Sequence, residues 1–119
     1  MSRQDTEAGA DPERRAEASA SAVDETMQAM LEQISTDAAR RTGAAPDAVK
    51  ILSVEAVTWS DGSLGCPEPG MLYTQALVPG HRISVDAGGA LLVYHANARG
   101  GFVQCPPERA LAPVPGDPV

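Results

Sequence analysis

The sequence predicts a small α+β domain, in which one N-terminal amphipathic helix packs on an antiparallel meander of four or five strands. Apolar residues recur at helical spacing before Gly43, whereas β-branched residues and alternating polarity dominate after Pro46. The later connections are short and rich in glycine, which favours antiparallel neighbours. The 119 residues fit one domain of modest size.

The helix is expected between Ser21, which can cap its start, and Thr42, because Gly43 supplies a stop. Its apolar stripe has spacings of three and four: Val23, Met27, Met30, Leu31, Ile34 and Ala38. Residues 35–37 could break it in two, since their side chains compete for backbone hydrogen bonds. Residues 1–20 are acidic and hold no large apolar residue after Met1, so we expect a disordered acidic arm there.

Five strand segments are predicted by their β-branched or alternating pattern: residues 49–59, 72–78, 81–87, 90–96 and 102–105. We expect Pro79 and Gly80 to form a tight turn, and Gly88 and Gly89 to form a hairpin. The folded domain should then span residues 22–106. Residues 107–119 are expected to form a Pro-rich tail, because proline continues neither a helix nor a central strand.

Composition excludes several function classes. Sixteen acidic and nine basic residues give a net charge of −7, which repels phosphate backbones and makes nucleic acid an unsuitable partner. No apolar run is long enough for a membrane span or an export signal, so we expect no membrane partner and, as the sequence is written, a cytoplasmic location. No cofactor or metal is expected, because His81, His95, Cys66 and Cys105 lack the close pairs typical of zinc sites.

The two cysteines leave three possibilities open. Cys66 and Cys105 can form a disulfide that closes a long loop, remain two buried thiols, or act as a reactive or metal-binding pair. A reducing compartment would argue against the bridge. In every case we expect the two side chains to lie close in space.

An irregular loop follows the first strand and is the main candidate for function. Three glycines and two prolines between residues 60 and 70 forbid regular structure and stiffen the chain, so it loses little entropy on binding, as in protease inhibitors. The candidate binding residues are Trp59, Asp61, Ser63, Leu64, Cys66, Pro67, Pro69, Met71, Tyr73 and Gln75. Alternatively, the loop only crosses the end of the sheet, with Leu64 as a plug in the core.

We expect no enzyme. Ser63 lacks the glycine two residues before it that a nucleophile elbow needs. A small enzyme acting through Asp61, Ser63 and His95 would need these side chains within hydrogen-bond reach of one another.

Residues 59–75, which read WSDGSLGCPEPGMLYTQ, together with Pro79, Tyr94, His95 and Cys105, resemble a family of small uncharacterised bacterial proteins, mainly from actinomycetes. The resemblance covers about residues 36–106 and implies one domain that carries a W-x-D-x-S-L-G-C-P-x-P-G motif followed by Y-x-Q. Ser60 stands where proline is common in the family. The resemblance brings no activity.

The sequence therefore predicts a non-catalytic module, a monomer or weak dimer, that binds an unidentified protein or peptide through an inhibitor-like loop. The alternative is a thiol- or metal-dependent protein that uses Cys66, Cys105 and His95.

Overall fold

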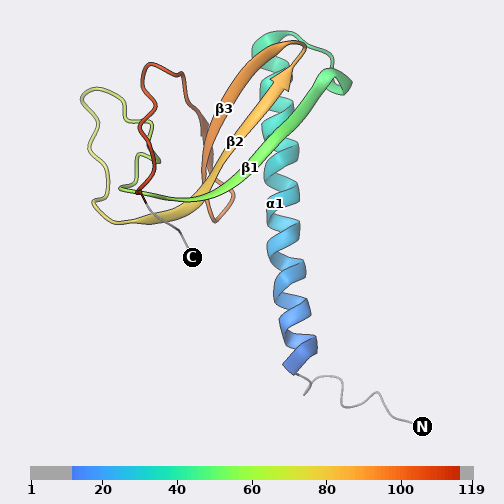
Figure 1. Ribbon diagram of the computed structural model, residues 1–119. Helices are drawn as coiled ribbons and strands as arrows, with labels where there is room; N and C mark the ends of the chain where they lie inside the picture. Colours follow the sequence, from blue (N-terminus) through green and yellow to red (C-terminus); the bar gives the residue numbers. More distant parts are fainter. Residues whose placement is uncertain (1–11, 116–119) are drawn as a thin grey trace.

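The computed structural model describes residues 12–115, with side chains from Glu25 onward (Figure 1). Along the chain it contains α1 (Pro12–Thr42), the 3-10 turn η2 (Pro46–Ala48), β1 (Val49–Trp59), β2 (Val78–Ala87), β3 (Ala90–Asn97) and β4 (Phe102–Gln104). Residues 1–11 of the expected acidic arm and the last four residues of the expected tail lie outside the described residues.

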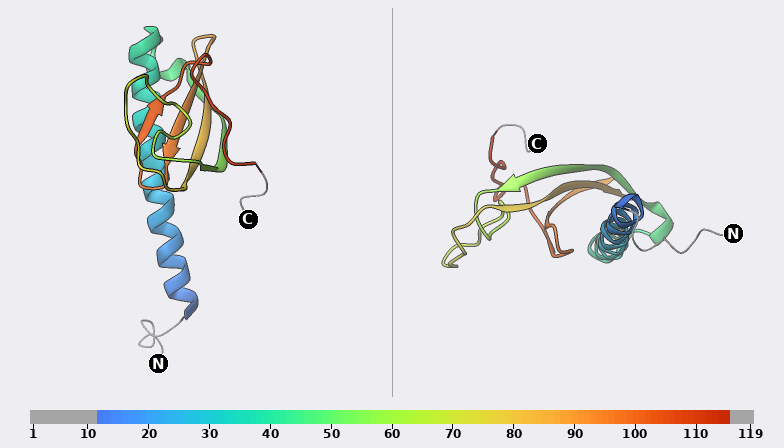
Figure 2. Two further views of the ribbon diagram at one scale, coloured as in Figure 1. Left: turned by 90° about the vertical axis from the view of Figure 1, so that its left-hand side faces the viewer. Right: turned by 90° about the horizontal axis from the view of Figure 1, so that it is seen from below.

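The four strands form one antiparallel sheet in the order β1-β2-β3-β4, and α1 packs on one of its faces (Figures 1 and 2). The predicted α+β class, with one helix on a meander, is confirmed. The first expected strand has the bounds of β1, and the hairpin through Gly88 and Gly89 joins β2 to β3.

The strand expected at residues 72–78 is wrong, and so is the tight turn at Pro79 and Gly80. Residues 71–77 are irregular, and β2 runs through both turn residues. Pro79 is tolerated because β2 pairs with β3 only from Gly80 onward, so Pro79 lies beside β1 alone and its missing N–H interrupts no second ladder. Gly80 is required by packing, since a Cβ there would overlap the carbonyl oxygen of Ala96.

The helix is longer than expected. It begins at Pro12, a favourable first helical residue, and continues through a run of Ala, Glu and Arg with high helix propensity instead of starting near Ser21. Residues 35–37 do not break it, because the Thr36 hydroxyl donates to the carbonyl of Glu32 (3.0 Å). The helix ends at Thr42 as expected, with Gly43 in the left-handed region (φ 76°). Its N-terminal part extends beyond the sheet (Figure 2).

The main core lies between α1 and the sheet. Its buried residues are Met30, Ile34, Ala38, Ile83, Val85, Ala87, Tyr94 and Ala96. At its border the Tyr94 hydroxyl donates to the carboxylate of Asp37 (2.5 Å), which also accepts a hydrogen bond from Arg41. Partial burial raises the pKa of Asp37, but the two hydrogen bonds, together with the positive charges of Arg41 and Arg40, hold the pKa below its ordinary value. The Tyr94–Asp37 contact ties the helix to β3.

Candidate functional site

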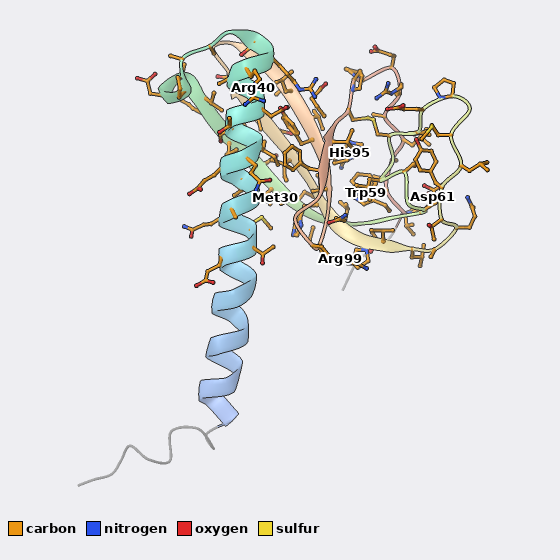
Figure 3. All side chains as sticks on the ribbon, turned by 180° about the vertical axis from the view of Figure 1, so that it is seen from behind. Met30, Arg40, Trp59, Asp61, His95 and Arg99 are labelled. Carbon is orange, nitrogen blue, oxygen red and sulfur yellow. A yellow bond between two sulfur atoms is a disulfide. The ribbon has the colours of Figure 1, made fainter. Side chains whose placement is uncertain are left out.

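A second cluster of buried residues lies on the sheet face opposite α1. Ile83 and Tyr94 are register partners on the helix face, so the next pair, Arg82 and His95, points to the other face. There the buried rings of Trp59 and His95 stack, with centroids 4.3 Å apart and planes at 21°. Figure 3 shows both side chains away from Met30 and the helix. We call Trp59, Ser63, Cys66, His95 and Cys105 the second core; all five are buried.

Hydrogen bonds fix both rings of this stack. The indole N–H of Trp59 donates to the carbonyl of Ala96 (3.0 Å). Nδ1 of His95 lies 2.6 Å from the carbonyl oxygen of Leu64, and since a carbonyl only accepts, this nitrogen carries the proton. Backbone carbonyls therefore satisfy Nε1 of Trp59 and Nδ1 of His95.

The loop turns tightly where it meets these rings. Leu64 has a left-handed backbone (φ 57°), a conformation that costs a residue with a Cβ roughly 1–2 kcal/mol. Gly65 follows at φ 70°, and a Cβ there would lie 2.6 Å from the Trp59 ring. The loop backbone thus lies directly against the indole, which only glycine permits at this position.

A disulfide joins Cys66 in the loop to Cys105, one residue after β4, with a Cα–Cα distance of 5.8 Å. Both cysteines are buried. The N–H of Cys105 also donates to the carbonyl of Val93 (2.9 Å), which connects the bridge to β3. The expected closeness of the cysteines is confirmed, and of the three possibilities the structure contains the bridge.

The described part of the expected tail packs on the loop. The N–H of Leu111 donates to the carbonyl of Gly65 and the N–H of Val114 to that of Thr58, each at 2.8 Å. Nη2 of Arg109 lies 3.5 Å from Sγ of Cys66. The ordered chain therefore continues past the expected boundary at residue 106. These contacts are mostly isolated backbone bonds, which leave no periodic pattern in the sequence.

The loop between β1 and β2 spans residues 60–77 and projects away from the helix, in yellow-green in Figure 1. It carries exposed apolar side chains. Met71, Leu72 and Leu77 are exposed, Leu72 at 95%. We call Met71 and Leu72 the apolar tip; Leu77 lies apart from them in the chain, next to the start of β2. Two contacts hold the loop that carries it: the N–H of Glu68 donates to the Tyr73 hydroxyl (3.0 Å), and the N–H of Gly62 donates to the carbonyl of Thr74 (2.9 Å).

The ten candidate binding residues divide by exposure. The buried ones are Trp59, Ser63 and Cys66; the half-buried ones are Asp61, Leu64, Pro67 and Tyr73; the exposed ones are Pro69, Met71 and Gln75. The buried residues anchor the loop, and only the exposed residues are fully accessible to a binding partner. Leu72 and Leu77 were not among the candidate binding residues predicted from the sequence, because a strand was expected at residues 72–78. A leucine that closely follows a Pro- and Gly-rich stretch could have indicated an exposed apolar side chain in the loop.

The residues of the small-enzyme hypothesis are only partly brought together. Oδ1 of Asp61 accepts hydrogen bonds from the hydroxyl (2.6 Å) and N–H (2.9 Å) of Ser63, and these bonds lower the pKa of Asp61. The N–H at Nδ1 of His95 donates to the carbonyl of Leu64 instead, and within residues 25–115 no hydrogen bond joins His95 to Ser63 or Asp61. The geometry forms a turn at Asp61 and contains no proton relay among these three.

A family model, described as Domain of unknown function (DUF8738), matches residues 31–105, which is more than half of the chain. The chain belongs to this family. The DUF8738 match contains all four strands, the loop and both cysteines, and it ends at Cys105. The segment that covers Gly65 and Thr58 lies beyond it. No curated protein matches the chain, and no solved structure does. In residues 12–115, no helix has the length and apolarity needed to cross a membrane.

The buried histidine predicts a pH dependence of stability. Burial lowers the pKa of His95, and Arg82 adds to this effect, while the bond to Leu64 opposes it. Because the folded-state pKa lies below the ordinary value of 6.5, stability is full above pH 6.5 and is lost as pH falls toward the lowered pKa. His95→Phe, which keeps a stacked ring, should flatten this decline in urea titrations between pH 7.5 and 5.

Some decline should remain in that variant, because burial also lowers the pKa of His81. Parallel curves for the wild type and His95→Phe would contradict the assignment of the decline to His95.

Proposed function

We propose that this domain is a non-catalytic binding module that engages a protein or peptide through the apolar tip. The observation that carries the proposal is Leu72, exposed at 95% on a loop whose base is tied by the disulfide and the second core. Large apolar side chains displayed on a rigid support bury apolar area on binding while little further chain entropy is lost.

The charge around the tip indicates the chemistry of the partner. Residues 60–77 contain Asp61 and Glu68 and no basic residue, in a chain of net charge −7. The partner surface that fits is an apolar pocket with a basic rim, because complementary charge speeds association and excludes acidic proteins. Leu72 would enter the pocket and Met71 would pack beside it.

The alternative, a thiol- or metal-dependent protein using Cys66, Cys105 and His95, has less support. The bridge leaves neither sulfur as a thiolate, which is the form that ligates metals and attacks substrates. Nδ1 of His95 is occupied by Leu64. These observations favour binding over catalysis for this loop.

Two further expectations accompany the proposal. The bacterial, mainly actinomycete origin of the family stays a prediction from the loop motif. The cytoplasmic location also stays a prediction. The alternative that the disulfide favours is an oxidising compartment, because structural disulfides persist there.

Photo-crosslinking tests the proposal. Leu72 is replaced by p-benzoylphenylalanine in the full chain, which is then irradiated in the native host. Leu91, an exposed leucine on β3, is replaced in the same way as the matched control. We expect one discrete adduct at position 72 that is absent at position 91 and is lost when Met71→Ser is added. Adducts of equal pattern at both positions, or none at position 72, would refute it.

A further inference from the structure

Among residues 12–115, the outer edge of β1 is uncovered along most of its length. Within this range β1 is the first strand in the sheet order and pairs only with β2. The described C-terminal segment covers this edge at Thr58, through the bond from Val114. Lys50 and residues 52–56 are exposed, including Leu52 (56%) and Val54 (42%). With no proline or glycine in its eleven residues, this edge can accept another strand.

A β-bulge in β1 changes which face of the sheet each side chain of this edge points to. Ile51 pairs with Val85 and Ser53 with Ser84, so Leu52 is an extra residue in the ladder. Ile51 and Val54 therefore lie on the same face, the one that carries α1. Lys50 and Glu55 lie together on the opposite face. In a regular strand, residues three or five apart would point to opposite faces.

We propose that two copies of this chain pair through their β1 edges, antiparallel, about a two-fold axis that passes between Leu52 and Ser53. In this register Ile51 lies opposite the partner's Val54, and Lys50 lies opposite the partner's Glu55. Because the contact is two-fold, each pair occurs twice. The two sheets become one continuous sheet, with both α1 helices on the same face.

Charge complementarity selects a second copy as the occupant. Within one chain, Arg82 already binds Glu55 (Nη2 to Oε1, 2.9 Å), and Lys50 lies across from Asp86. When the two edges pair, these charged residues form one row across the joined sheet in which negative and positive charges alternate: Asp86, Lys50, the partner's Glu55, the partner's Arg82. Exposed pairs contribute little energy each, so they set the register, while main-chain hydrogen bonds and the Ile51 and Val54 contacts supply affinity.

The same register satisfies charge and apolar contacts only because of the bulge. Without the extra residue, opposing Lys50 to Glu55 would place the two side chains on opposite faces of the joined sheet. A bulge and a lysine can also protect an edge from pairing. A chain whose edge is protected in this way stays monomeric.

Sedimentation of the full chain tests the proposal. We expect a species of twice the 12.3 kDa chain mass. Val54→Lys should weaken dimerisation at least about tenfold, since it buries two charges in the joint. Leu91→Lys is the matched control, an exposed leucine on an inner strand, and should leave the dimer intact. A monomer at every concentration, or a dimer unaffected by Val54→Lys, would overturn the proposal.

A crosslink tests the register. A mixture of Lys50→Cys chains and Glu55→Cys chains should form a mixed disulfide under mild oxidation, because opposed residues on paired strands have Cβ atoms about 5 Å apart. Lys50→Cys alone should not crosslink, since its two copies lie five residues apart along the joint. Equal crosslinking of Lys50→Cys with itself would refute this register.

Discussion

Replacing both cysteines by alanine, Cys66→Ala with Cys105→Ala, is expected to lower the free energy of unfolding by about 4 kcal/mol. The two bridged cysteines lie 39 residues apart in the sequence. Without the bridge, the unfolded chain gains conformational entropy, which favours unfolding. Because β4 has only three residues, the bridge is also a covalent connection between the short end of the sheet and the loop. Urea unfolding followed by tryptophan fluorescence measures the difference, since Trp59 is the only tryptophan.

Wild-type protein unfolded in the presence of a reductant is the matched control and should show a similar loss. Alanine adds a small packing deficit in the variant, because both cysteines are buried. A loss below about 1 kcal/mol in both samples would contradict the role assigned to the bridge.

Trp59→Ala is expected to destabilise the domain by about 3–5 kcal/mol. The ring is fully buried, stacks on His95 and supports the backbone of Gly65. Its removal opens a cavity under the loop and leaves the Ala96 carbonyl without the indole hydrogen bond. Thermal unfolding followed by circular dichroism measures the loss.

Trp59→Phe separates packing from hydrogen bonding. It keeps an aromatic ring beside His95 but removes the donor to Ala96, so we expect an intermediate loss of about 1–3 kcal/mol. Equal losses for the Ala and Phe variants would show that the hydrogen bond, and not the packing of the ring, dominates at this position.

The main core was predictable from sequence because its residues follow simple periods. The helical stripe of Met30, Ile34 and Ala38 and the alternation of Ile83 and Val85 each place one face inward, and both sets are buried. The helix end at Gly43 and the hairpin at Gly88 were predictable from local turn chemistry. The start of α1 was not, since a stretch without large apolar residues carries no signal except helix propensity.

The second core was harder to predict because it depends on contacts distant in sequence. Trp59 and His95 meet only when β1, β2 and β3 are in register, and Leu64 reaches His95 through a left-handed turn that no pattern signals. The prediction of a turn at Pro79 and Gly80 was wrong. Both residues fit in β2 because of how β2 pairs with β1 and β3, and this strand pairing cannot be deduced from the local sequence. The loop itself was identified from its glycines and prolines, but the division into buried anchor and apolar tip required the structure.

A disulfide between Cys66 and Cys105 anchors the loop that carries the apolar tip. Intact mass of the protein taken from its native host, alkylated with and without prior reduction, shows whether this bridge is formed. We predict no alkyl group before reduction and two afterwards, one on each cysteine. Two alkyl groups added without reduction, under non-denaturing and denaturing conditions alike, would contradict the bridge and leave the loop without its anchor.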